Sequence, residues 1–347
     1  TPRSSSAASD VYKRQIPPHN LSEVIDGINL FISNNDVEIE DLIKVVKAPD
    51  FPTGGIIYGY EGVKEAFMTG RGKVVIRGRA VIEEIDNREC IVVDQIPYLT
   101  NKADMIRKTA ELINDKKIEG ISSIRDESDR KGMRLVYILK RDAIPNIVLN
   151  KLYKFTQLQS SFSVNSIALV KGRPKLLNLK ELISNFVEHR HDVVVRRSKY
   201  ELKKAEERAH ILKGLIVASD NIDRVIELIR SSENTESAKK SLQDQFELTE
   251  IQAKAIVEMR LRQLTGLEQE KLRDEFEELN KTIERLKNIL SNKDLRMDII
   301  KDELTVVKDK YGDERRSIID YTGGNFSVED MIPNEKVVVT ISHAGYI

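Results

Sequence analysis

The chain has 347 residues, enough for two or three domains, and its 56 Lys and Arg residues are matched by 56 Asp and Glu residues. The resulting net charge of zero argues against a stand-alone nucleic-acid-binding module, because such modules are usually basic overall. The one cysteine, Cys90, excludes an internal disulfide framework, and no apolar run approaches the ~20 residues of a membrane span.

The first fifteen residues, TPRSSSAASDVYKRQ, differ in character from the segment that follows them. They have no hydrophobic periodicity, and DVYKRQ resembles the translated end of a transposon used in sequencing libraries. A disordered native tail is the alternative, but we expect residues 1–15 to be a non-native library scar. Because the chain also stops soon after the strand pattern at 337–341, we expect a fragment truncated at both ends.

A helix with a well-defined start is expected over residues 20–31. Asn20 can cap its amino end, Glu23 follows three residues later, and apolar residues recur at helical spacing. Before it, a Pro-Pro pair holds the backbone extended behind Ile16. Ile16 is therefore either a core residue or an apolar wedge that enters a base step of a DNA duplex, and the pattern alone leaves both open.

Residues 54–170 mix strand and helix signals. Including the short helix that precedes them, the predicted helices cover 39–46, 61–68, 102–114 and 144–155, and the predicted strands cover 56–58, 73–83, 90–93, 133–139 and 162–170. A turn at residues 86–88 joins two of these strands as a hairpin. This order of elements predicts an α+β domain with an antiparallel sheet.

Basic residues cluster on and before one strand of this domain. Alternation along the strand predicted over 73–83 places Arg77 and Arg79 on the same face. A solvated sheet face and a surface that contacts DNA phosphates are both consistent with this strip. The candidate phosphate contacts, including one at the start of a predicted helix, are Arg71, Lys73, Arg77, Arg79 and Lys102.

Two long helical patterns, over 178–230 and 267–311, follow the α+β domain with no interior proline. Apolar residues in the second pattern form a heptad seam, at Leu272, Phe276, Leu279, Ile283, Leu286 and Leu290. A compact apolar stretch, 231–266, lies between the two patterns. We expect a long antiparallel α-helical coiled coil with a small helical globule at its tip.

The sequence contains no recognisable catalytic constellation. The segment TGRGKV (69–74) lacks the first glycine and the final Ser/Thr of a Walker A loop. His189 and His191 point to different faces of a helix, and Cys90 fits the core of a strand. We therefore expect no catalytic residue, no metal site and no cofactor site in this chain.

A series of long motifs carries a family resemblance. The motifs are IPPHNLSEVIDG (16–27), PDFPTGG (49–55), TGRGKVVIRGRA (69–80), IPYLTNKADMI (96–106), EGISSIRDESDRKGMRLV (119–136), LQSSFSVNSIALVKGRPKLLNLKELI (158–183) and LTEIQAKAIVEMRLRQLTGLE (248–268). They resemble the A subunits of bacterial type IIA DNA topoisomerases over nearly the whole chain from Ile16 onward. The terminal VVVTISHAGYI and the tip motif favour the gyrase branch. The topoisomerase IV branch is the alternative, and a structural coiled-coil protein that organises DNA is a more distant one.

The resemblance implies a role for each part of the chain. It assigns 16–176 to a tower, or shoulder, domain beside the DNA gate, 177–230 and 267–320 to the two coiled-coil helices, 231–266 to the lower dimer gate, and 321–347 to a linker and the first strands of a DNA-wrapping propeller. Within and beside the gate segment, the residues expected at the dimer contact are Ile256, Met259, Leu261, Leu264 and Leu267.

The resemblance also implies a function. Such dimers cleave both strands of one duplex, pass a second duplex through the break and reseal it, and gyrases use ATP to introduce negative supercoils. Ile16 matches the isoleucine that intercalates into gate DNA and bends it. The catalytic Arg-Tyr pair of the family precedes that isoleucine, so this fragment should be inactive alone.

The partners that the resemblance implies are double-stranded DNA, a second copy of the chain, and the B subunit, in a heterotetramer of two A and two B subunits. ATP and magnesium are expected on the B subunit, not on this chain. The expected location is the cytoplasm, in association with the nucleoid and not with a membrane.

Overall fold

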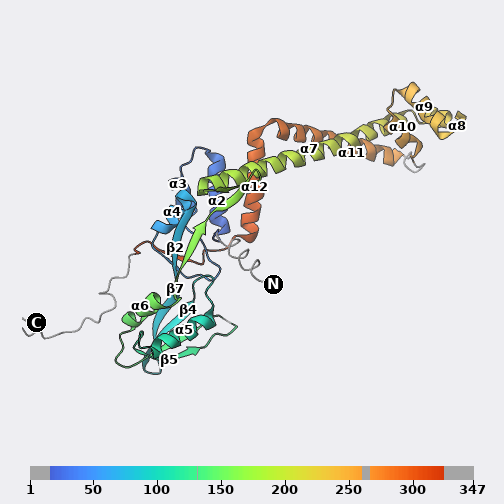
Figure 1. Ribbon diagram of the computed structural model, residues 1–347. Coiled ribbons are helices and arrows are strands. Elements are labelled where there is room, and N and C mark those ends of the chain that lie inside the picture. The colour runs from blue at the N-terminus through green and yellow to red at the C-terminus, as the bar shows by residue number, and fades with distance from the viewer. Residues whose placement is uncertain (1–15, 131, 260–265, 324–347) are drawn as a thin grey trace, which may run out of the picture. The chain divides into compact units, whose positions relative to one another are not determined.

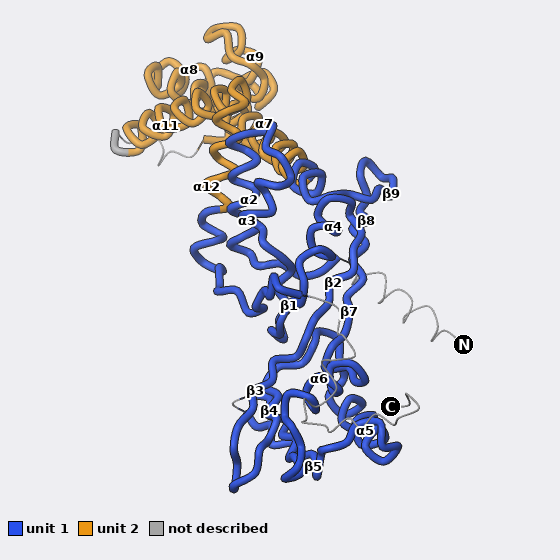
Figure 2. Tube along the Cα trace, turned by 90° about the vertical axis from the view of Figure 1, so that its left-hand side faces the viewer, with its two compact units in different colours: residues 1–185, 305–347 blue, residues 186–304 orange. Residues whose placement is uncertain are grey.

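The computed structural model describes residues 16–130, 132–259 and 266–323. The chain divides into two compact units, one formed by 1–185 with 305–347 and the other by 186–304 (Figure 2). The segment 1–15, interpreted as a library scar, and the segment 324–347, which holds the predicted propeller strands, lie outside the described residues. No described helix is both long and apolar enough to cross a membrane.

The first unit begins with three helices and a short strand. These elements are α2 (Leu21–Ser33), α3 (Ile39–Val45), β1 (Ile56–Tyr58) and α4 (Glu61–Thr69). The side chain of Asn20 accepts hydrogen bonds from the backbone N–H groups of Ser22 and Glu23, so α2 is capped as predicted. The apolar stripe of α2 is buried, which confirms the predicted core face of this helix.

Four strands form the first sheet, in the order β10-β1-β2-β7, and Figure 1 labels its neighbouring strands β2 and β7. The strands added to β1 are β2 (Arg71–Arg77), β7 (Gln159–Asn165) and β10 (Ile318–Asp320). β10 is parallel to β1, and the other pairs are antiparallel. α4 packs closely on β2, because a Cβ on Gly62 would lie 2.0 Å from the carbonyl oxygen of Lys73.

The second sheet is antiparallel throughout, as predicted, with the order β3-β4-β6-β5. Its strands are β3 (Arg79–Ile85), β4 (Arg88–Gln95), β5 (Ile121–Asp126) and β6 (Leu135–Leu139). The predicted hairpin is formed by β3 and β4, with Asp86 and Asn87 both at positive φ in the turn. α5 (Lys102–Asn114) and α6 (Pro145–Phe155) contribute to the same buried core as this sheet, through Met105 and Leu152.

The single strand predicted over 73–83 is wrong, because the chain changes sheets at Gly78. β2 ends at Arg77 in the first sheet, and β3 begins at Arg79 in the second. The backbone N–H of Gly78 donates to the carbonyl oxygen of Leu158, and the Tyr153 hydroxyl donates to the carbonyl oxygen of Gly78. These contacts hold the joint and separate two arginines that alternation had placed together.

The strand predicted over 162–170 is also divided. β7 ends at Asn165, and β8 (Ile167–Val170) then pairs with β9 (Arg173–Leu176) in a two-stranded sheet of its own. Three strands, β5, β9 and β10, were not predicted from the sequence. They are short, with 6, 4 and 3 residues, and two of them are mostly polar or charged, so periodicity carries little signal for them.

The first helix of the second unit starts in the first unit. The helices are α7 (Leu179–Asp220), α8 (Ile222–Ser231), α9 (Thr235–Phe246), α10 (Glu250–Val257), α11 (Gly266–Ser291) and α12 (Lys293–Tyr311), the last of which ends in the first unit. Residues of the predicted seam on α11, including Ile283 and Leu279, pack against Ala205 and Ala209 of α7. The helical pairing is therefore present, and its supercoiling stays a prediction.

The returning segment was predicted as one helical pattern over 267–311, within the range 267–320 that the resemblance assigns to it. It ends at Tyr311 as the pattern predicted, but it is interrupted at Asn292. Arg296 of α12 donates to the backbone carbonyl oxygens of Ile289 and Leu290 at the end of α11, at 2.8 and 2.6 Å. Its Nε–H donates to Nε2 of His191 at 2.9 Å. The guanidinium therefore caps one helix from the next and stabilises the break.

After α12 the chain is held against the amino-terminal helices of the first unit. Arg315 donates to both carboxylate oxygens of Glu23, at 3.0 and 2.9 Å, and to the carbonyl oxygens of Pro49 and Ala48. The pair is largely buried, with 17% and 14% of the two side chains exposed. This network brings residues 313–318 to the edge of β1, where β10 then pairs.

Candidate nucleic-acid interface

One face of the first sheet carries part of the predicted basic strip. Arg71, Lys73, Val75 and Arg77 alternate with the buried Val74 and Ile76, so the basic residues share a face. Their cross-strand partners on β7 are all polar, namely Asn165, Ser163, Ser161 and Gln159. The face therefore presents cations together with neutral hydrogen-bonding groups, the combination that binds phosphate oxygens.

An open groove of about 480 Å³ crosses this face, lined among others by Tyr58, Tyr60, Lys73, Arg77, Gln159 and Tyr321. The rings of Tyr60 and Tyr321 lie 5.1 Å apart. The Tyr60 hydroxyl donates to the carbonyl oxygen of Lys47, and burial raises the pKa of Tyr60 to about 12. Tyr60 is therefore a neutral, fixed wall of the groove at physiological pH.

Arg71 and Lys73 are the two predicted contacts that are free to meet an anion. Both are exposed, and neither forms an ion pair within the described part of the chain. A phosphate can therefore approach either side chain without displacing a carboxylate.

The other predicted basic residues have intramolecular partners. Arg77 is half-buried beside Tyr58 and Gln159, and burial lowers the pKa of its guanidinium. Arg79 forms a salt bridge with Asp94. Lys102 pairs with Asp126 at 2.7 Å, and this contact is the main reason why the pKa of Asp126 falls to about 2. The predicted basic strip is therefore not one continuous surface, because Arg77, Arg79 and Lys102 are each held by a different partner.

Ile16 is 44% exposed and stands at the rim of a small apolar pocket. Behind it, Nδ1–H of His19 donates to the carbonyl oxygen of Pro17 at 2.9 Å, and the imidazole lies 5.6 Å from the ring of Phe67. Nε2 of His19 is buried without a hydrogen-bond partner, and burial lowers the pKa of His19 to about 4. A neutral, packed histidine therefore supports the segment that presents Ile16.

The predicted dimer-contact residues have different surroundings. Ile256 is 3% exposed and lies in a core shared with Leu212 and Leu242, so it stabilises its own chain and is not available to a second copy. Met259 packs partly against the same core. Leu261, Leu264 and the side chain of Leu267 lie outside the described residues. Ile251, which was not among the predicted dimer contacts, is 61% exposed on α10.

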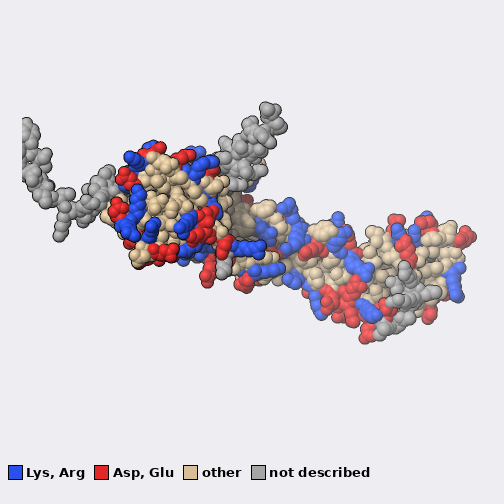
Figure 3. Space-filling view, turned by 90° about the horizontal axis from the view of Figure 1, so that it is seen from below, with Lys and Arg blue, Asp and Glu red and all other residues tan. Residues whose placement is uncertain are grey.

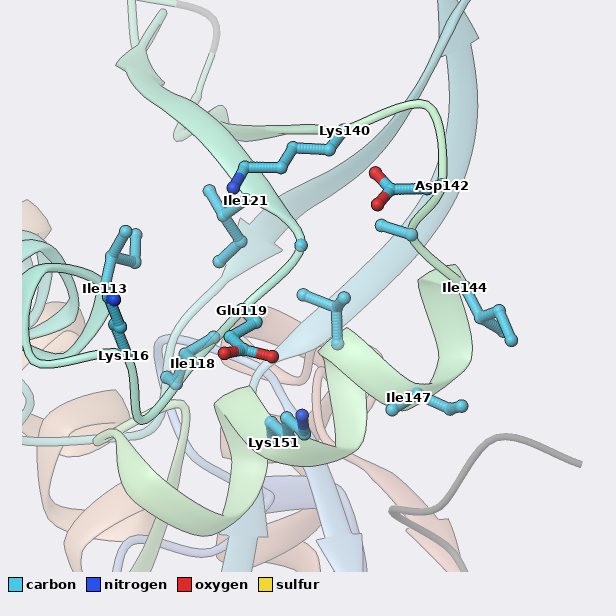
Figure 4. A pocket seen from close by; sticks show the side chains of 13 residues that line it. Ile113, Lys116, Ile118, Glu119, Ile121, Lys140, Asp142, Ile144, Ile147 and Lys151 are labelled. Carbon is cyan, nitrogen blue, oxygen red and sulfur yellow. The ribbon is translucent and has the colours of Figure 1, made fainter.

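A second pocket of about 510 Å³ lies between the end of α5 and α6 (Figure 4). Its lining combines three lysines, Lys116, Lys140 and Lys151, with the carboxylates of Glu119 and Asp142 and with five isoleucines, of which Ile118 and Ile121 are buried. Mixed charge is also the character of the surface in Figure 3, where basic and acidic side chains intermingle. On the face shown, charge of either sign is therefore local and does not form one extended field.

Sequence reasoning missed the aromatic lining of the groove and the anchoring role of Arg315. Alternation also applies to β1, where Ile56 pairs with Arg77 and Tyr58 lies two residues further along on the same face. Pairing β1 with β2 would therefore have placed Tyr58 on the same face as Arg77, whose guanidinium lies over its ring. No local signal marks this role of Arg315, because Glu23, Ala48 and Pro49 lie more than 260 residues away along the chain.

Comparisons with known proteins identify the family of the chain. The sequence profile of the DNA gyrase/topoisomerase IV A-subunit family matches residues 11–305. The chain is 50% identical over 333 residues to the DNA gyrase A subunit of Clostridium acetobutylicum, covering 96% of this chain and 40% of that protein. It is 49% identical over 332 residues to the same subunit of Halalkalibacterium halodurans, again covering 96% and 40%. It is 50% identical over 335 residues to that of Staphylococcus epidermidis, covering 96% and 38%.

The chain thus spans about two fifths of the length of these relatives, 38% or 40% in each case. The profile and the relatives together cover both units that the structure describes. The chain therefore belongs to the DNA gyrase/topoisomerase IV A-subunit family.

Proposed function

We propose that this chain is the part of a gyrase A subunit that supports and bends gate DNA and that forms the lower dimer gate during strand passage. The observation that carries the proposal is the 50% identity to the A subunit of a DNA gyrase across 96% of the chain. The relatives described above bear the gyrase name, which favours gyrase over topoisomerase IV.

In this proposal Ile16 is the wedge. Its support is geometric: the side chain is 44% exposed although Pro17 and His19 behind it are packed into the unit. An apolar side chain on a rigid support can enter a base step without losing conformational entropy of its own backbone. Arg71 and Lys73 would contact phosphates beside the bent duplex, whereas Arg77, Arg79 and Lys102 are engaged in contacts within the first unit.

The whole enzyme is proposed to act as an ATP-dependent type II topoisomerase, an isomerase that introduces negative supercoils. The B subunit would supply the ATP and magnesium sites, and two A and two B subunits would form the heterotetramer, in the cytoplasm with the nucleoid. Strand cleavage would belong to the catalytic Arg-Tyr pair that the family resemblance implies.

The proposal is tested by DNA bending in an intact A subunit that carries these residues, assembled with its B partner. A duplex labelled at both ends reports its bend through energy transfer, and Ile16→Ala should reduce the transfer efficiency. Val81→Ala is the matched control, because Val81 is 48% exposed on β3 and lies away from the wedge segment. Equal bending by the wild type and Ile16→Ala would remove the wedge role.

A further inference from the structure

Residues 167–176 form a two-stranded ribbon, here called the β8–β9 ribbon. β8 and β9 pair with each other and with no other described strand, and in Figure 2 they stand at the margin of the first unit. Two hydrogen bonds hold the root of the ribbon, from the N–H of Ser166 to the carbonyl oxygen of Gly70 and from the N–H of Leu177 to that of Ser166. The ribbon itself receives little support from the sheet that it leaves.

One face of the ribbon is apolar and exposed. Cross-strand pairing joins Ile167 with Leu176 and Leu169 with Pro174, so these four side chains share a face. Leu169 is 74% exposed and Ile167 is 41% exposed. A two-stranded ribbon is marginally stable alone, and exposed apolar side chains on it weaken solubility, so such a face marks a contact surface.

The same ribbon is basic. Lys171, Arg173 and Lys175 are all exposed, and the segment SIALVKGRPKLL (166–177) contains no Asp or Glu. The turn places Lys171 and Gly172 at φ values of 50° and 79°, which sets two cationic side chains at and beside the tip. Lys175 pairs with Glu181, but both side chains are solvent-exposed and the pair is weak. Pairing with Ala168 and Val170 places Lys175 and Arg173 on the face opposite to Leu169. The matching partner therefore offers anionic groups to one face of the ribbon and apolar surface to the other.

The root of the ribbon adjoins the wedge. Ile16, Val164 and Ser166 line one small pocket, so the ribbon leaves the sheet next to the segment that presents Ile16. A duplex bent at Ile16 would therefore run close to the root of the ribbon.

We propose that the β8–β9 ribbon is a second DNA-contact element, which enters a groove of double-stranded DNA with its tip cations on the phosphates and Leu169 against the sugars and base edges. The major groove is ~12 Å wide and admits a two-stranded ribbon, and duplex DNA carries one charge per ~1.7 Å of its axis. This inference rests on the proposed function, because it takes DNA as the polyanion that this protein meets.

The test measures binding of the full chain to a fluorescein-labelled duplex, about four helical turns long, by anisotropy at several salt concentrations. Lys171→Ala/Arg173→Ala should weaken binding on the order of tenfold and lower the slope of log affinity against log salt by about 2, since each phosphate contact contributes ~0.9. Lys240→Ala/Lys281→Ala is the matched control, because it removes the same charge from exposed positions of the other unit.

A photo-crosslinking amino acid at position 169 gives a readout that does not depend on the charge change. Crosslinking of the duplex from position 169, and none from position 81, is expected. If the wild type binds the duplex and the ribbon and control variants give equal slopes, the ribbon proposal alone is overturned. If the wild type does not bind the duplex, the proposed function is overturned as well. A Leu169→Ser variant that loses self-association but keeps DNA affinity would assign the face to a second copy and overturn the proposal.

Discussion

The guanidinium carbon of Arg77 lies 3.2 Å from the centroid of the Tyr58 ring. On its other side the guanidinium carbon is 4.9 Å from the ring centroid of Tyr153, and Nε–H donates to Gln159 at 2.6 Å. Tyr153 in turn holds the carbonyl oxygen of Gly78, where the chain changes sheets. Arg77 is therefore a structural cation at the joint between the two sheets, although its charge and position suggested a DNA contact.

Replacing Arg77 should destabilise the first unit. Arg77→Ala removes a partly desolvated cation–π contact and the bond to Gln159, so the free energy of unfolding should fall by about 2 kcal/mol. Urea unfolding followed by circular dichroism measures this change. Arg71→Ala, on the same strand but exposed, should change stability by less than about 0.5 kcal/mol. A similar effect of the two substitutions would mean that the stacking of Arg77 is unimportant.

The largely buried pair of Arg315 and Glu23 should contribute more to the free energy of unfolding than the contacts of Arg77 do. Arg315→Ala leaves a carboxylate and two backbone carbonyls without their donor, and we expect a loss of about 3 kcal/mol in the free energy of unfolding. Arg316→Ala is the control, because the Arg316 side chain is 56% exposed and its ion pair is local. A double-mutant cycle with Glu23→Gln should give a coupling energy above about 1 kcal/mol, and additive effects would contradict the interpretation.

His19 should make stability fall with acid. Because burial lowers the folded-state pKa to about 4 from 6.5, only the unfolded chain binds a proton at His19 between these pH values. The free energy of unfolding should therefore drop as the pH falls from 6.5 to 4, by at most about 3 kcal/mol, and should not change through His19 above pH 6.5. Thermal unfolding at about pH 7 and about pH 4.5 measures it.

The difference between wild type and His19→Gln isolates this contribution from other titrating groups. His19→Gln should show a smaller loss of stability between the two pH values, whereas His189→Gln, at an exposed position on α7, should behave as the wild type does. Identical pH dependence of the wild type and His19→Gln would show that the pKa of His19 is the same in the folded and unfolded chain.

The exposed cations of the first sheet should contribute phosphate contacts. Arg71→Ala/Lys73→Ala should lower the slope of log affinity for duplex DNA against log salt by about 2 without changing the fold. Anisotropy with a labelled duplex measures the slope, and Lys108→Ala/Lys281→Ala provides the charge-matched comparison. A slope equal to that of the comparison variant would show that Arg71 and Lys73 are solvated and contact no phosphate.

Self-association should depend on Ile251. A charge at this exposed position of α10, introduced by Ile251→Asp, should raise the dimer dissociation constant by about tenfold or more if the face meets its copy. Sedimentation velocity at micromolar concentration measures it, with Val306→Asp as the control because Val306 is 64% exposed on α12. An unchanged dissociation constant would exclude Ile251 from the dimer contact.

Much of the fold was predictable because its signals are local. The capped start of α2, the turn at Asp86 and Asn87, and helix α5, whose predicted bounds match those of the structure, follow from residue types and spacing within a few residues. The heptad seam on α11 likewise indicated a helical partner, which α7 provides. The family resemblance was carried by long motifs in a fixed order, and the comparisons confirmed it.

The sequence by itself therefore determined most of the helices, the α+β and long-helix architecture and the family. Only the tertiary structure decided which cations remain available to a ligand, because that depends on partners far along the chain: Gln159 for Arg77, Asp126 for Lys102 and Glu23 for Arg315. The division of one predicted strand at Gly78 also depends on contacts with residues 75 or more positions away. Alternation describes one strand in isolation, whereas the sheet to which each half belongs is determined by the free energy of the whole packed unit.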